Sequence, residues 1–148
     1  MEQRFETFTV LITKISRSIR RIKTEEMAEF DLKSPHVSCI YYLYRNGEMS
    51  AKELCDVCDE DKAAISRAIG YLEDNGYIEC NSKAEKRYKS PLRLTANGKK
   101  IGAKVADKID NILKLANPNM SDNELKQFYQ SLTTIANNLQ KICEGYGE

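Results

Sequence analysis

Apolar residues recur at alternating steps of three and four positions near both ends of this 148-residue chain. The first stripe contains Phe5, Phe8, Ile12, Ile15, Ile19 and Ile22. The second contains Leu125, Phe128, Leu132, Ile135, Leu139 and Ile142. Such spacing places apolar side chains on one narrow face of an α-helix, as in helices that pack lengthwise on each other. Both ends are therefore predicted to be long helices.

Two arrangements would cover these stripes: packing of the terminal helices within one chain, or a homodimer interface built from both. Two long stripes exceed what one small core requires, so the homodimer is the favoured interpretation. The residues predicted at the dimer interface are Phe5, Phe8, Ile12, Ile15, Ile19, Leu125, Phe128, Leu132, Ile135 and Leu139. A further helix is expected over about 97–116, and Ser121 with Glu124 forms a capping box before the last helix.

Shorter helices are expected in the middle of the chain. The first begins with Ser34 as N-cap and Pro35 at N1, and it ends where Gly47 can supply a left-handed cap. A second capping box, in residues 50–53, opens a helix of about two turns. The residues of that helix expected to point inward are Leu54 and Val57.

The period of the pattern then changes. A third helix over about 62–74 is followed by a strand over 77–80 and a partner strand over 92–95, with Pro91 as in an isolated two-stranded hairpin. The third helix is expected to bury Ile65, Ile69 and Leu72. This order of elements is that of a winged helix-turn-helix, so the predicted fold class is mainly α (α+β).

Charge is distributed unevenly along the chain. The total is +1, with 23 Lys+Arg and 22 Asp+Glu, which alone argues against a nucleic-acid partner. However, residues 83–104 hold eight basic residues and one acid, residues 14–23 hold five bases, and residues 53–61 hold five acids. A basic hairpin tip beside a helix-turn-helix favours nucleic-acid binding.

The five cysteines and the single histidine indicate no metal site. Cys55 and Cys58 form a C-x-x-C pair, but no second pair or H-x3-H partner accompanies it. With an odd count and no export signal, the cysteines are predicted to be reduced thiols and His36 to be structural. A thiol- or metal-responsive regulator that uses Cys55, Cys58 or Cys80 remains an alternative.

No motif for catalysis or membrane insertion is present in the sequence. It has no Gly-rich phosphate loop, no nucleophile motif and no 18-residue apolar stretch. The N-terminal residues lack the basic region and cleavage signal of a secretory peptide. We therefore expect a cytoplasmic protein that is not an enzyme and needs no cofactor.

Four segments, in this order and spacing, resemble the MarR family of bacterial winged-helix transcriptional regulators. They are Ser50-Ala-Lys-Glu-Leu54, Asp61-Lys-Ala-Ala-Ile-Ser-Arg67, Leu72-Glu-Asp-Asn-Gly-Tyr-Ile78 and Leu94-Thr-Ala-Asn-Gly98. The resemblance implies one MarR-like domain over 1–148, with a helical dimerisation region (1–30 and 98–148) and a winged helix-turn-helix (34–97). It also implies an obligate homodimer on pseudo-palindromic double-stranded DNA, commonly a repressor released by a small-molecule effector.

The resemblance places DNA contacts on the third helix and the wing. The helix offers Lys62, Ala63, Ala64, Ser66 and Arg67, of which Arg67 suits a bidentate pair with guanine. Ser50 is placed to hold a phosphate, while Asp59, Glu60 and Asp61 should stabilise the helix N-terminus and point away from DNA. In the wing, Arg87 matches the residue that enters the minor groove and Glu85 its brace. The other basic wing residues are Lys83, Lys86 and Lys89.

The effector is harder to predict. Tyr41, Tyr42 and Tyr44, with side chains of the first helix (Phe8, Ile12 and Arg20), could line a cleft, but aromatics at helical spacing are more often core, so no ligand contact is assigned. A winged-helix protein-interaction module is a further alternative. Such a module predicts a wing without basic residues, which this sequence contradicts.

Overall fold

The computed structural model describes residues 4–58, 60–80 and 90–147. The chain divides into two compact units, Met1–Asn111 and Ile112–Glu148, which are described separately. The described part is mostly helical with one small antiparallel sheet, so the predicted fold class is confirmed. The first unit holds the winged helix-turn-helix, and the second holds the end of α5 and the whole of α6.

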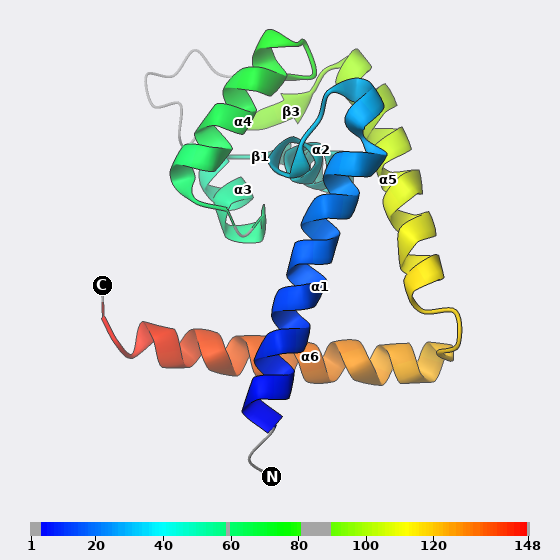
Figure 1. Cartoon of the computed structure of the whole chain (residues 1–148). Helices are drawn as coiled ribbons and strands as arrows, with labels where there is room; N and C mark the ends of the chain where they lie inside the picture. The colour runs from blue at the N-terminus through cyan, green and yellow to red at the C-terminus, as the bar shows by residue number, and fades with distance from the viewer. Residues whose placement is uncertain (1–3, 59, 81–89, 148) are drawn as a thin grey trace. The chain divides into compact units, whose positions relative to one another are not determined.

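The helices fall close to their predicted positions (Figure 1). They are α1 (Arg4–Glu26), a 3-10 turn (Ala28–Phe30), α2 (Ser34–Asn46), α3 (Ala51–Cys58), α4 (Lys62–Asp74), α5 (Ala96–Ala116) and α6 (Asp122–Glu144). Within the first unit, α2 contacts α1, α3, α4 and two strands. It therefore forms the centre of the winged helix-turn-helix.

One hydrophobic core holds the elements of the first unit together. Ile40 of α2, Leu54 of α3, Leu72 of α4 and Val105 of α5 have no exposed surface. Burying an aliphatic side chain of this size stabilises the fold by about 1.5–3 kcal/mol. The core thus fixes α3 and α4 against α2, which sets the geometry of the helix-turn-helix.

Within the described residues the sheet has three strands, so the predicted isolated two-stranded hairpin is wrong. β1 (Glu48–Met49) pairs with β3 (Leu92–Leu94), and β3 also pairs with β2 (Ile78–Cys80), in the order β1-β3-β2. A two-residue strand is too short to show the alternation by which strands are recognised. Gly47, at φ +85°, turns the chain from α2 into this strand.

Two local predictions are also wrong. Ser34 is the first residue of α2 and not its N-cap, which is Lys33, because the Lys33 N–H is accepted by His36 Nδ1 at 3.0 Å. Val57 is 41% exposed and does not point inward. The inward face of α3 instead comprises Ala51 and Leu54, with the half-buried Cys55 and Cys58 at its edges.

The wing strands are closely joined to α5. The Thr95 hydroxyl donates a hydrogen bond to the Gly76 carbonyl at 2.6 Å and accepts the Gly98 N–H at 3.0 Å. A Cβ on Gly98 would overlap the Tyr77 carbonyl oxygen. The Leu94–Gly98 motif therefore has a structural basis: only glycine permits this approach of helix to strand.

The two apolar stripes lie on α1 and α6 as predicted. No residue of α1 or α6 is buried. Ile15 is 50% exposed and Ile19 47% exposed in α1, and Leu139 of α6 is 49% exposed. Among the described helices, none combines the length and the apolar character that a bilayer crossing requires.

Candidate functional site

The predicted capping box at the start of α3 is confirmed. Ser50 Oγ accepts the Glu53 N–H at 3.2 Å, and the Glu53 carboxylate accepts the Ser50 N–H at 2.7 Å. The Ser50 backbone N–H, which donates to the carboxylate, and the Ser50 side chain lower the pKa of Glu53 because they stabilise its charged form. The cap is therefore a sufficient reason for Ser50, and its phosphate contact stays a prediction.

Acidic side chains shape the turn before α4. Asp61 is the N-cap of this helix, and its carboxylate accepts the Ala64 N–H at 2.6 Å. Glu60 forms an ion pair with Arg20 of α1 at 3.0 Å, and only 12% of its side chain is exposed. Two of the three acids are thus engaged within the protein, and Asp59 lies outside the described residues.

The residues of α4 divide into distinct faces. Ile65, Ala68 and Leu72 are buried against the core, and Ile69 is half-buried. The Tyr71 hydroxyl donates to the Asp31 carbonyl at 2.8 Å and fixes one flank of the helix. The predicted contact residues that are exposed are Lys62, Ala63, Ser66 and Arg67, whereas Ala64 is half-buried.

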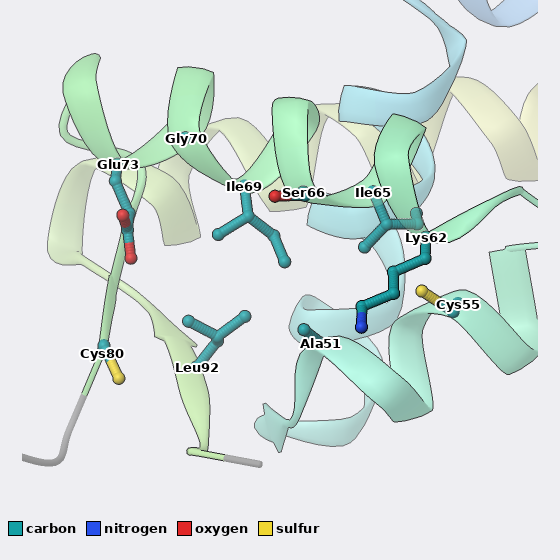
Figure 2. Close-up of a pocket in the computed structure, with 10 residues that line it drawn as sticks. All are labelled: Ala51, Cys55, Lys62, Ile65, Ser66, Ile69, Gly70, Glu73, Cys80 and Leu92. Atoms are coloured by element: carbon teal, nitrogen blue, oxygen red, sulfur yellow. The ribbon is translucent and has the colours of Figure 1, made fainter. Parts of the chain in front are cut away.

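A cavity of about 250 Å³ lies between α4, α3 and the strands β2 and β3 (Figure 2). Its walls are mainly apolar, and Lys62 and Ser66 border it together with Glu73. Figure 2 shows the Lys62 side chain extending from α4 toward α3, beside Cys55. The cavity side chains are Ala51, Cys55, Lys62, Ile65, Ser66, Ile69, Glu73, Cys80 and Leu92.

The sequence did not predict this cavity, because its walls come from four separate elements and no local sequence pattern indicates how these elements pack together. The predicted DNA-binding residues of α4 differ in their position relative to the cavity. Lys62 borders the cavity, whereas Arg67 does not. Arg67 and Ala63 are exposed on the helix surface away from the cavity lining.

The predicted wing residues fall outside the described part of the chain. They are Lys83, Glu85, Lys86, Arg87 and Lys89. At the base of the wing, Arg93 Nε and Glu79 Oε1 form a cross-strand ion pair at 2.8 Å, with both side chains about half exposed. This pair links β3 to β2 on the exposed face of the sheet.

The cysteines are dispersed over several elements. Cys55 and Cys80 border the cavity, and Cys143 is exposed on α6. A hydrogen bond with the buried Cys39, aided by the nearby Lys23 ammonium, lowers the pKa of Cys58. Within the described ranges, no three His, Cys, Asp or Glu side chains are grouped as a metal site would require.

The histidine and the tyrosines have packing roles. His36 stacks on Tyr71 with ring centroids 4.3 Å apart. Tyr41 contacts Tyr42 edge to face at 5.4 Å, and the Arg45 guanidinium lies 5.5 Å from the Tyr41 ring centre. Arg20, also considered for an effector cleft, instead pairs with Glu60. No ligand contact is assigned to these side chains.

Together, the short α3, the turn, the surface helix α4 and the antiparallel strands define a winged helix-turn-helix protein. Residues 30–87 match the sequence model of the MarR family. The HTH-type transcriptional regulator YwoH of Bacillus subtilis is 32% identical over 82 residues, which cover 53% of this chain and 60% of YwoH. Residues 30–87 are thus similar to the MarR family of transcriptional regulators, and the chain spans less than two thirds of the length of YwoH.

Solved structures share this fold. The MarR family regulator NMB1585 from Neisseria meningitidis superposes with a TM-score of 0.80 at 19% identity, covering 94% of this chain and 95% of that one. A MarR family regulator from Listeria monocytogenes, solved in complex with 26mer DNA, has a TM-score of 0.79 at 21% identity, covering 86% and 85%. At these identities the likeness shows the fold.

Proposed function

We propose that this protein is a homodimeric, sequence-specific DNA-binding regulator that acts in the cytoplasm as a repressor. The observation that carries the proposal is the exposed face of α4, on which Ala63 and Arg67 are held outward by a helix whose opposite face is buried. The DNA complex of the similar Listeria monocytogenes protein supports it. A helix of this kind reads base edges in the major groove.

Each exposed residue would have a distinct part in recognition. Arg67 donates a bidentate pair to guanine, and the Ala63 methyl packs on a thymine methyl. Lys62 contacts phosphate, Ser66 contacts either phosphate or a base, and Ser50 assists with phosphate at the start of α3. In the wing, Arg87 enters the minor groove with Glu85 as its brace, and Lys83, Lys86 and Lys89 add counterion release.

The exposed apolar stripes support the homodimer. Residues such as Ile15, Ile19 and Leu139 are about half exposed, although side chains of this type are mostly buried in folded proteins. A second copy of the chain would cover them. Two copies would place two α4 helices in successive major grooves, with half-sites about 34–36 Å apart.

Release of DNA by a small-molecule effector is part of the proposal, as the family resemblance implies. Oxidation of Cys58 is a second candidate trigger, since this free thiol is only half-buried at the end of α3, and the nearby Cys39 and Lys23 lower its pKa. A thiolate reacts faster with peroxides than a thiol. Binding of DNA before and after peroxide treatment distinguishes the two triggers.

The decisive experiment is selection of bound duplexes from a random-sequence DNA library by the purified full chain. We expect a pseudo-palindromic consensus. Arg67→Ala should relax the preference at one base pair of each half-site, worth about 1–3 kcal/mol. Arg87→Ala should weaken binding to all duplexes and make the salt dependence of the affinity less steep.

The matched control is Lys126→Ala, which removes one positive charge from an exposed residue of α6. It should leave both the consensus and the salt dependence unchanged. Failure to enrich any sequence would contradict sequence-specific binding. A salt dependence that is the same for Arg87→Ala and the wild type would exclude the proposed role of the wing.

A further inference from the structure

The helix α1 is tied to the turn that opens α4. Its Arg20 places Nη1 3.0 Å from Glu60 Oε1, across a separation of 40 positions in the sequence. The Glu60 side chain is only 12% exposed, and it directly precedes Asp61, the N-cap of α4. A carboxylate so far removed from water requires a compensating charge, and Arg20 supplies it.

A second cation of α1 reinforces this attachment. Lys23 lies one turn after Arg20, and its Nζ donates to Ser38 Oγ of α2 at 2.9 Å. Burial lowers the pKa of Lys23, while the charges of Cys58 and Glu60 act in the opposite direction. The groups around Glu60 are therefore two cations of α1, the Cys58 sulfur at the end of α3 and the Cys39 sulfur of α2.

The chain of contacts continues into the recognition helix. Glu60 is joined by one peptide bond to Asp61, whose carboxylate accepts the Ala64 N–H at 2.6 Å. On the other side, Arg20 directly follows Ile19 of the exposed apolar stripe. A displacement of α1 would thus be transmitted to the first turn of α4 through the Arg20–Glu60 ion pair and the Asp61 cap.

We propose that Glu60 is a positioning residue: through Arg20 it makes the placement of the DNA-reading face of α4 depend on α1. The inference rests on the proposed DNA-binding function. The ion pair is partly shielded from solvent, so salt screens it less than it screens exposed pairs. Loss of the pair leaves the first turn of α4 held by the Asp61 cap and the core, without its link to α1.

The variant Glu60→Gln distinguishes the positioning role of Glu60 from the effect of its negative charge on DNA binding. Removing an acid near a DNA-binding surface should strengthen DNA binding if only the net charge mattered. The positioning role predicts the opposite, a loss of affinity of about fivefold or more, the lower range for coupling between linked sites. The probe is the duplex that the wild-type chain enriches from a random-sequence library.

Charge reversal provides the test of the pair itself. Arg20→Glu should weaken binding to the same duplex, and the double variant Arg20→Glu/Glu60→Arg, which restores the net charge and the pair, should recover most of the affinity. The matched control is Arg17→Glu, an exposed residue of α1 one turn earlier. Its loss of affinity gives the purely electrostatic effect of the same change in charge.

Amide hydrogen exchange of peptides covering residues 61–67, measured without DNA, gives an independent reading. Glu60→Gln should accelerate exchange there and leave the core of α2 unchanged, with an unchanged thermal midpoint. Unaltered or tighter DNA binding by Glu60→Gln would overturn the proposal, as would unaltered exchange. If the wild type enriches no duplex, the proposed function fails. The exchange experiment then still tests whether Glu60 connects α1 to the first turn of α4.

Discussion

Gly98→Ala should destabilise the protein even though alanine is the better helix former. The gain from helix propensity is at most about 1 kcal/mol. Against it, the new methyl group would overlap the Tyr77 carbonyl oxygen and lie 2.9 Å from the carbonyl carbon, and it would also lie 3.2 Å from Leu94 Cδ2. Backbone atoms cannot move aside as a flexible side chain would, so α5 must shift away from the strand.

That shift would strain the Thr95 bonds to Gly76 and Gly98, at 2.6 and 3.0 Å. Overpacking costs about 1–3 kcal/mol, and we expect a net loss of about 2 kcal/mol. Gly70→Ala is the matched control, because it lies inside α4 with nothing within 4 Å of the added methyl group. It should stabilise by about 0.5–1 kcal/mol.

The assay is urea unfolding followed by circular dichroism, at one protein concentration because self-association changes the midpoint. With a slope of about 2 kcal/mol per molar urea, the Gly98→Ala midpoint should fall by about 1 M. The Gly70→Ala midpoint should rise by about 0.3–0.5 M. Equal or greater stability of Gly98→Ala would refute the steric argument, since propensity would then outweigh the contact with Tyr77.

Two further predictions concern the dimer and the dependence of stability on pH. Ile15→Glu should convert the dimer to monomer in sedimentation experiments. The control is Val10→Glu, which should leave the dimer intact because Val10 is 63% exposed and lies off the stripe. A dimer that survives Ile15→Glu would contradict the proposed interface. Bonds with Ser50 lower the pKa of Glu53, so its ionised carboxylate stabilises the folded state at pH values above the ordinary pKa of 4.5. This contribution is lost as the pH falls through the lowered pKa of the folded state. The difference in urea midpoint between wild type and Glu53→Gln should therefore be constant near neutral pH and disappear in acid.

The helices were predictable because their signals are local. Repeated apolar steps located α1 and α6, and the Ser121 capping box placed the start of α6 within one residue, with Glu124 accepting the Ser121 N–H at 2.8 Å. β1 was missed because two residues carry no period, and its pairing depends on β3, whose partner residues lie 43 and 45 positions away. The orientation of Val57 was missed because α3 is too short for its pattern to favour one of two faces.

The candidate site was predictable only in part, for the same reason. The exposed face of α4 follows from the positions of Ile65 and Leu72, since the side opposite a buried stripe faces solvent. The cavity beside α4 does not, because its walls meet only in the folded unit. The sequence also could not show that Glu60 lies against α1, although its acidic neighbours suggested a role away from DNA.

That ion pair changes what the charge pattern means. The basic run in 14–23 and the acidic run in 53–61 are separate in the sequence, but Arg20 and Glu60 meet in the folded unit, and Lys23 lies near the same carboxylate. Part of the basic charge of α1 is therefore neutralised within the protein and is not available to phosphate. Counterion release on DNA binding should then arise mainly from the wing and α4, so the salt dependence of the affinity should respond to Arg87 far more than to Arg20.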